Sequence, residues 1–168
     1  MKYQTGDILL YDRLGDGWQR RLFGTLVQLF NDSEYVHTAI YLGEHDKFGK
    51  IIAESVASGF LIRVHDNLGD KHLRYKNELT EQQKKHLIDQ CISMSGYSYG
   101  YFDLIKILFY KLTGEKLFFS TYKQLTCTES VARVYDQIGI KLVDKQDYDL
   151  TYPQDIENSK ELITISVD

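Results

Sequence analysis

Three residues of this sequence carry the side chains of a cysteine-nucleophile site: Cys127, His37 and Glu54. A thiolate attacks carbonyl carbon, an imidazole moves the protons, and a carboxylate holds the imidazole ring in place. The histidine precedes the cysteine by 127 − 37 = 90 residues. We therefore ask which elements of the fold could bring these side chains together for acyl chemistry through a thioester.

Cys127 lies where the sequence predicts the start of a helix. Thr126 and Glu129 form a capping-box pattern, which makes Thr126 the N-cap and Cys127 the first helical residue. The positive end of the helix dipole lowers a thiol pKa, and first-turn N–H groups can bind an oxyanion. The alternative is that Cys127 is a small core residue, because free cysteine is often buried. Cys91, in the middle of an apolar helix face, is expected to be core packing.

His37 lies inside a predicted strand over 35–42. Alternation of side chains places Tyr35, His37, Ala39 and Tyr41 on one face, and the intervening residues on a face suited to a core. A strand does not require a histidine in order to fold, so His37 is a candidate base. The alternative is an ordinary surface histidine on a half-exposed strand.

Glu54 lies among apolar residues in the next predicted strand, over 50–57. If the two strands pair antiparallel through the 43–50 loop, residue 37 opposes either residue 54 or residue 56. Both registers place Glu54 and His37 on one face within reach of each other. The carboxylate would then fix the imidazole tautomer and favour its charged form. The alternative is that Glu54 only makes an exposed strand face soluble.

The other four histidines do not form a metal-binding pattern. They are expected in polar loops, at strand ends or on an exposed helix face, and the sequence contains neither H-E-x-x-H nor C-x-x-C. We therefore expect no metal site and no cofactor. These residues are His45, His65, His72 and His86.

The pattern of strands and helices that the sequence predicts indicates an α+β chain that forms one domain over residues 1–168. Its β-rich half covers roughly 1–70 and its helical half roughly 80–140. Strands are predicted over 8–11, 35–42, 50–57, 60–64 and 162–167, and helices over 17–30, 80–96, 102–112 and from 127 to just before 139. The order of the strands cannot be derived from these patterns.

Composition excludes several classes of function. The net charge is −4, so nucleic acid is not an expected partner. No apolar run approaches the ~20 residues of a membrane span, and no secretory signal is visible. We expect a cytoplasmic site of synthesis, free thiols, and a monomer or weak homodimer. The apolar stretch 103–120 could be a lid, a membrane-surface contact, an interface or a helix that completes the core.

The order histidine, carboxylate, cysteine resembles the circularly permuted branch of the NlpC-type papain-like superfamily, which includes YiiX-like and poxviral proteins and, more distantly, lecithin:retinol acyltransferase. The matching stretches are "GDILLYD" (6–12), "VHTAIYLG" (36–43), "AES" (53–55), "GYSYG" (96–100) and the helix opened by Thr126 and Cys127. Two features depart from the pattern. The stretch 103–120 is longer and more apolar than expected, and Thr126 stands where relatives commonly carry an aromatic residue.

The resemblance implies a papain-like cysteine-hydrolase fold with permuted topology, in which a small antiparallel sheet packs against helices. It implies a thiol hydrolase or amidase that cleaves an amide or peptide bond, with cell-wall peptide as one substrate. Cys127 would attack, His37 would move protons, Glu54 would orient His37, and Tyr99, Tyr35 and Thr126 would contact substrate. The alternatives are a lipid-directed acyltransferase or lipase with the same triad, a non-catalytic binding protein that retains the cleft, and a structural protein.

Overall fold

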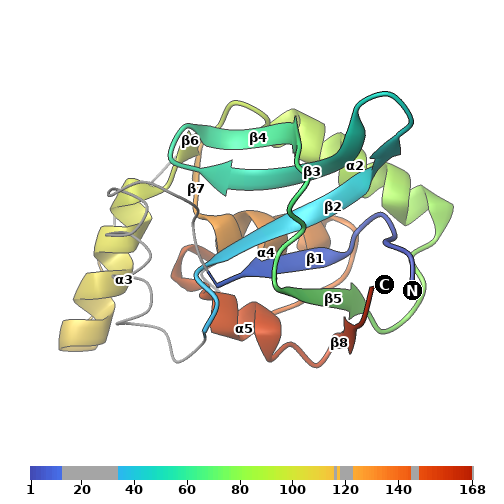
Figure 1. The fold of residues 1–168 in the computed structure, drawn as a ribbon. Helices are drawn as coiled ribbons and strands as arrows, with labels where there is room; N and C mark the ends of the chain where they lie inside the picture. The colour runs from blue at the N-terminus through green and yellow to red at the C-terminus, as the bar shows by residue number, and fades with distance from the viewer. Residues whose placement is uncertain (13–33, 116, 118–122, 145–147, 168) are drawn as a thin grey trace.

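The computed structural model describes residues 1–12, 34–115, 117, 123–144 and 148–167, so the helix predicted over 17–30 lies outside the described residues. Within them, one antiparallel sheet has six strands in the order β4-β3-β2-β1-β5-β8 (Figure 1). The strands are β1 (Ile8–Tyr11), β2 (His37–His45), β3 (Gly49–Val56), β4 (Gly59–Val64), β5 (Lys71–Tyr75) and β8 (Leu162–Ile165).

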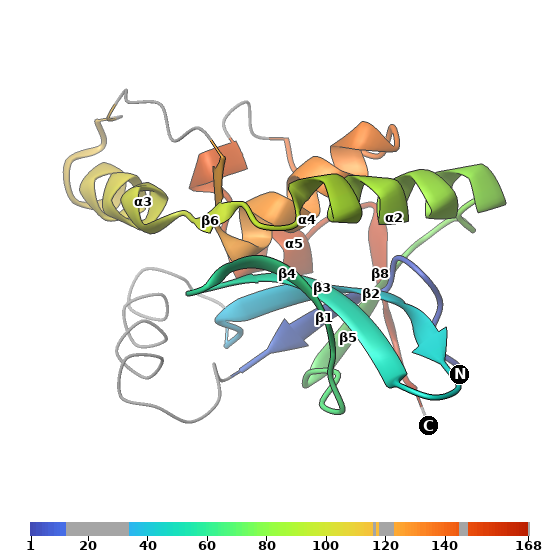
Figure 2. The ribbon, with the colours of Figure 1, turned by 90° about the horizontal axis from the view of Figure 1, so that it is seen from above.

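The helices of the described residues pack mainly on one face of this sheet. They are α2 (Glu81–Met94), α3 (Tyr101–Thr113), α4 (Cys127–Gln137) and α5 (Pro153–Glu157), with a 3-10 turn η1 (Tyr148–Leu150). Figure 2 shows α2, α4 and α5 above the sheet and α3 at one end of it. The α+β prediction, with an antiparallel sheet packed against helices, is therefore confirmed.

Two apolar clusters sandwich the sheet. The larger one joins Ile8, Ile40 and Phe60 to residues of α2 and α4, such as Leu87 and Val131. The smaller cluster lies on the opposite face and comprises Leu9, Tyr11, Ala39, Tyr41, Ile52 and Leu68. Strand alternation produces this division, because successive side chains of β1 and β2 point to opposite faces.

A second, two-stranded sheet connects the large sheet to the helical side. β6 (Ser98–Tyr99) pairs in parallel with β7 (Gln124–Leu125), which places Tyr99 opposite Leu125. Gly59 makes the approach possible: its φ is 113°, and a Cβ there would lie 2.5 Å from the carbonyl oxygen of Tyr97. That carbonyl accepts the N–H of Phe60 at 2.8 Å, so β4 and the start of β6 are held together.

Helix α3 has a polarity that its composition did not predict. The sequence describes the stretch from 103 as apolar, yet the buried residues of α3 include the charged Asp103 and Lys106. Phe102 is 52% exposed and Leu112 is 72% exposed. Lys106 forms an ion pair within α3 with Asp103 at 3.0 Å and a second one with Asp149 at 2.9 Å, and the second attaches α3 to η1. Among the described residues no helix is long and apolar enough to cross a membrane.

Candidate active site

The nucleophile candidate lies at the N-terminus of α4, as the sequence predicts. The hydroxyl of Thr126 accepts the N–H of Glu129 at 3.2 Å, and Glu129 Oε2 accepts the N–H of Thr126 at 3.3 Å. This reciprocal capping box makes Cys127 the first residue of the helix. The prediction for the helix start is confirmed, and it places the Cys127 sulfur at the positive end of the helix dipole.

Glu54 and His37 are in contact across the β2–β3 pair. Ala39 opposes Glu54, so residue 37 is in register with residue 56 and Glu54 lies one diagonal away. This is the second of the two registers that the sequence allows. Glu54 Oε2 lies 2.5 Å from His37 Nε2. Because Nε2 is engaged there, Nδ1 is the ring nitrogen left to serve the sulfur.

Arg63 holds the other oxygen of this carboxylate. Its Nε donates to Glu54 Oε1 at 2.5 Å, and its Nη2 forms an ion pair with the same oxygen. Arg63 lies on β4 opposite Ile52, two residues before Glu54 on β3. The sequence reasoning missed Arg63, although the predicted strand 60–64 beside the glutamate strand carries it.

The charge state of Glu54 follows from these two contacts. Burial alone would raise the pKa of the Glu54 carboxyl. The hydrogen bonds and positive charges of His37 and Arg63 outweigh burial and hold that pKa below its ordinary value. The carboxylate is therefore ionised at neutral pH even though only 3% of its side chain is exposed.

Cys127 completes the line of contacts. Burial opposes ionisation of its thiol, but a hydrogen bond with His37, the charge of that imidazole, and the backbone N–H groups of Thr38 and Thr128 lower its pKa overall. Two main-chain amides thus stabilise the sulfur as an anion, one from β2 and one from the first turn of α4. This arrangement favours a thiolate at neutral pH.

His37 responds in the opposite direction. Burial lowers the pKa of an imidazole, but the hydrogen bonds and negative charges of Cys127 and Glu54 raise the pKa of His37 overall. The raised pKa of His37 and the lowered pKa of Cys127 describe one buried pair, which holds the proton on the ring rather than on sulfur. Cys127 is 6% exposed and His37 is 5% exposed.

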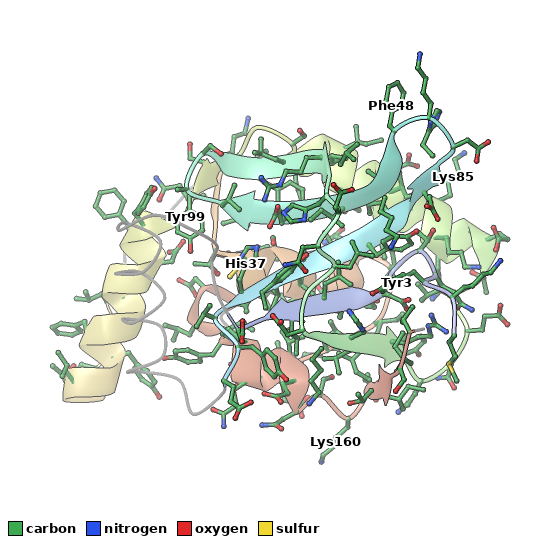
Figure 3. All side chains as sticks on the ribbon, viewed as in Figure 1. Tyr3, His37, Phe48, Lys85, Tyr99 and Lys160 are labelled. Carbon is green, nitrogen blue, oxygen red and sulfur yellow. The ribbon has the colours of Figure 1, made fainter. Side chains whose placement is uncertain are left out.

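Tyr99 lies beside this pair, at the side of the site that faces α3 (Figure 3). Burial and then the charge of Cys127 raise the pKa of the Tyr99 hydroxyl, which indicates that the two side chains are close. Its ring meets that of Tyr101 edge-on, with centroids 5.0 Å apart. The β6–β7 pairing places Tyr99 there, because its strand partner Leu125 precedes the nucleophile by two residues.

The main chain that leads to the nucleophile is held from the large sheet. Ser55 Oγ donates to the carbonyl oxygen of Leu125 at 2.6 Å, and Ser130 Oγ donates to that of Cys127 at 2.7 Å. Ser55 directly follows Glu54 on β3. The segment that presents the sulfur is therefore fixed at both ends by buried hydroxyl groups.

Two further predicted contacts have other partners. Tyr35 precedes β2, which begins at His37 rather than at residue 35, so the expected face-sharing of Tyr35 with Ala39 and Tyr41 does not follow from alternation. Tyr35 instead packs against the larger apolar cluster, with Lys71 Nζ 5.7 Å from its ring centre. Thr126 is 2% exposed and its hydroxyl serves the helix cap. Substrate contact by either residue stays a prediction.

Cys91 differs from Cys127 in the expected way. It is fully buried in α2, and desolvation raises the pKa of its thiol to about 12. Both cysteines are free thiols. One histidine lies where it was not expected: His72 is in β5, a strand that the sequence reasoning missed, and its Nε2 is 3.0 Å from the hydroxyl of Tyr3.

Comparison with known proteins finds similarity in fold and none in sequence family. No family model matches the sequence, and no curated protein is significantly similar to it. The fold is similar to that of the metalloprotein YiiX from Escherichia coli O157:H7, solved by crystallography, with a TM-score of 0.68 and 18% sequence identity. The likeness covers 98% of this chain and 97% of that protein. The order and positions of the strands and helices thus belong to a known architecture: this chain has a YiiX-like α+β fold.

Proposed function

We propose that the protein is a thiol hydrolase that cleaves an amide or peptide bond with Cys127, His37 and Glu54. The observation that carries the proposal is that His37 hydrogen-bonds both the carboxylate of Glu54 and the sulfur of Cys127. An imidazole between a carboxylate and a thiol at a helix N-terminus is the arrangement that stabilises a thiolate–imidazolium pair.

The acylation half follows from this charge state. The Cys127 thiolate attacks the carbonyl carbon of the substrate, forming a C–S bond and an oxyanion. The oxyanion then collapses and the C–N bond breaks. Because the proton already resides on the ring, His37 acts first as the acid: it gives this proton to the departing amine, and the acyl group remains on sulfur as a thioester.

The deacylation half returns the site to its starting state. Neutral His37 takes a proton from water while the water oxygen attacks the thioester carbon. The C–S bond breaks, the carboxylic acid leaves, and the thiolate–imidazolium pair is restored. Glu54 keeps the ring in one orientation throughout and stabilises its charged form.

The oxyanion is assigned to the first turn of α4. The N–H of Glu129 is used by the Thr126 hydroxyl, and that of Thr128 is directed to the sulfur. The N–H of Cys127 itself is the first-turn donor nearest the reacting carbon, so we assign the oxyanion to it. Tyr99 bounds one side of the cleft in this proposal. Cell-wall peptide is the substrate that the family resemblance favours, by analogy.

The described residues do not fit a metal at this site. YiiX is described as a metalloprotein. In this chain both oxygens of Glu54 are engaged, by His37 and by Arg63, so a cation bound there would displace both partners. Within the described ranges no group of three or more His, Cys, Asp or Glu side chains is placed to hold a metal ion. The proposal therefore contains no step through a metal.

The proposal is tested by trapping the thioester. The protein is mixed with an N-acetyl amino-acid p-nitrophenyl ester and quenched in acid, and the intact mass is measured. We expect one added acyl group on Cys127, present in Cys91→Ala and absent in Cys127→Ala, whose melting temperature stays close to that of wild type. Acylation that persists in Cys127→Ala, or none in wild type, would exclude the assigned nucleophile.

One observation favours a second candidate, an acyltransferase or lipase that acts on lipid. Phe102 and Leu112 of α3 are more than half exposed, as expected for a helix that contacts a membrane surface. Phe118 and Phe119, which the apolar stretch also contains, lie outside the described residues. Sedimentation with phosphatidylcholine vesicles should show binding that Leu112→Ser weakens and Phe48→Ser, on the distant β2–β3 turn, does not. Absence of vesicle binding would remove this candidate.

A further inference from the structure

Tyr11 packs against the ring of His37 from the neighbouring strand. It is the last residue of β1 and lies directly opposite His37, the first residue of β2 (Figure 1). Side chains opposed in this way on an antiparallel pair lie close together on one face of the sheet. The centres of the two rings are 5.5 Å apart, and the ring planes are inclined at 48°. The imidazole thus has a phenol ring beside it, in addition to Glu54 and Cys127.

Hydrogen bonds on both sides hold Tyr11 and the end of β1 in place. The Tyr11 hydroxyl donates to the carbonyl oxygen of Asn67 at 3.2 Å. The carbonyl oxygen of Tyr11 accepts the N–H of Val36 at 2.8 Å, and that of Leu10 accepts the N–H of Asp70 at 2.7 Å. The loop between β4 and β5 therefore anchors the phenol at its outer end, and the ring stays against the imidazole.

Tyr11 contributes its ring to this contact and no charge. Burial and then the charge of Glu54 raise the pKa of the Tyr11 hydroxyl, so the phenol is neutral at neutral pH. A cation within about 6 Å of an aromatic ring centre is attracted to that ring, and more strongly where water is excluded. Tyr11, His37 and Glu54 are all buried. The ring therefore favours the charged form of the imidazole.

The titratable and charged groups around the two rings come from several elements. Glu54 of β3 and Cys127 of α4 hydrogen-bond the imidazole. The ring of His65 lies on another side of Tyr11, with centroids 6.4 Å apart. The other groups that act electrostatically on the phenol are Arg63, Tyr3 and Asp70. Glu54 and Cys127 thus engage the imidazole nitrogens, whereas Tyr11 contacts the ring itself.

We propose that Tyr11 is a positioning residue for the Cys127 site, whose ring keeps the His37 imidazole in line with Glu54 and Cys127 and stabilises its charged form. The role of Tyr11 in turnover rests on the thiol hydrolase proposed above, whereas its effect on the charge of His37 does not require turnover. Without the ring the imidazolium is less stable, so the pKa of His37 falls. The thiolate then loses part of its positive partner, so the pKa of Cys127 rises.

The test measures these two pKa values in the full chain. The pKa of His37 is followed by NMR of ¹³C-histidine-labelled protein that carries Cys127→Ala, and that of Cys127 by iodoacetamide labelling across pH. Tyr11→Leu should lower the first and raise the second by about half a unit to one unit, the size of a cation–π contact. Tyr41→Leu is the matched control and should shift neither value. Tyr41 is also buried, belongs to the same apolar cluster, and has its ring 5.2 Å from that of Tyr3.

A second pair of proteins keeps the shape of the side chain, in case Tyr11→Leu does not fold. Tyr11→Phe retains the ring and loses only the hydroxyl anchor, so it should shift the pKa of His37 less than Tyr11→Leu does. A phenylalanine with three ring fluorines at residue 11 has nearly the same shape but an electron-poor face. It should lower the pKa of His37 below the value in Tyr11→Phe.

Two results would overturn the role of Tyr11. One is the same pKa of His37 in Tyr11→Leu and Tyr41→Leu, and the other is the same pKa in Tyr11→Phe and its fluorinated counterpart. Both differ from a failure of the hydrolase. If wild type forms no thioester while Tyr11→Leu still lowers the pKa of His37, the hydrolase is excluded and the effect of Tyr11 on the imidazole is supported.

Discussion

His37 Nε2 lies 2.5 Å from Glu54 Oε2 because β2 and β3 pair in the register that sets Ala39 opposite Glu54. The carboxylate reaches the ring diagonally, and Arg63 holds its other oxygen from the far side of β3. The imidazole is therefore fixed by a side chain that is itself fixed. Such a chain of contacts makes the charge on Cys127 sensitive to residues that do not touch it. This sensitivity can be measured through the reactivity of Cys127.

The first prediction concerns the reactivity of Cys127 toward iodoacetamide. Its lowered pKa keeps sulfur ionised at pH values where an ordinary thiol, with a pKa near 8.5, is mostly protonated. We expect a labelling rate that rises less steeply between pH 6 and 8 than that of an ordinary thiol, measured by mass spectrometry. Cys91, whose thiol pKa is raised to about 12, should stay unlabelled until the chain unfolds. A rate for Cys127 that rises about tenfold per pH unit over this range would contradict the thiolate assignment.

The second prediction ranks two substitutions by their effect on acyl transfer. His37→Ala removes the group that moves the proton, and it should lower the rate by about 10²–10⁴. Glu54→Gln keeps the size and one hydrogen-bond acceptor but loses the charge, so its effect should be smaller. Rates of p-nitrophenol release from the ester substrate give the comparison. The reverse ranking would mean that the roles of Glu54 and His37 are misassigned.

The third prediction concerns Arg63, which acts on the sulfur only through Glu54 and His37. Arg63→Gln should raise the pKa of Glu54, and a Glu54 carboxyl that is protonated no longer stabilises the charged form of His37, so the acid side of the pH profile of Cys127 labelling should shift upward. Arg63→Lys should recover part of the shift because it restores the charge without the fork of donors. A profile identical to wild type in Arg63→Gln would limit Arg63 to a surface contact.

The fourth prediction concerns Glu129, which caps the helix that carries Cys127. Burial raises the pKa of its carboxyl from the ordinary 4.5 to about 7, against the opposing effect of Arg133. Its folded-state pKa exceeds the unfolded one, so its contribution to stability is fully present below pH ~4.5 and is lost as pH rises to about 7. The shift corresponds to a loss on the order of 3 kcal/mol.

Glu129→Gln is the matched variant for this effect, because glutamine also completes a capping box. Urea unfolding between pH 4.5 and 8 should show a free energy of unfolding that declines with pH in wild type and declines less in Glu129→Gln. Parallel pH curves for the two proteins would show that ionisation of Glu129 does not affect stability.

Local signals were sufficient for the elements that position Cys127. The capping pair Thr126–Glu129 predicted the start of α4, and the helix predicted over 80–96 corresponds to α2; the structure contains a capping box at the start of each. The predicted strand over 8–11 matches β1. Alternation placed Glu54 and His37 within reach, but two registers were open. The register that is observed depends on the pairing of β2 with β3, which includes a bulge between Tyr41 and Gly43.

Other elements depend on contacts that no local pattern contains. β5 has charged side chains at three of its five positions if His72 is counted, so it does not alternate as a half-buried strand does. β6 and β7 have two residues each and exist only because they pair with each other. The burial of the Lys106 ammonium depends on its meeting Asp149, which lies 43 residues later in the chain. For α5 the sequence did contain a local signal that we did not use: Pro153 is its first helical residue, a position where proline is typical.

Strand β3 aligns both halves of the candidate machinery through two adjacent side chains. Glu54 points to one face and orients the imidazole, while Ser55 points to the other and holds the Leu125 carbonyl ahead of the sulfur. Deleting a single residue upstream within β3 would exchange these faces: the Ser55 hydroxyl would meet the ring, the Glu54 carboxylate would take the place of Ala53 in the apolar core, and Val56 would stand beside the Leu125 carbonyl. The contact that orients the base and the contact that holds the nucleophile segment would therefore be lost together. Lengthening the turn between Val56 and Gly59 would instead leave Glu54 and Ser55 on their present faces of the sheet. Anyone who transplants this triad onto another scaffold must copy that strand as an indivisible unit.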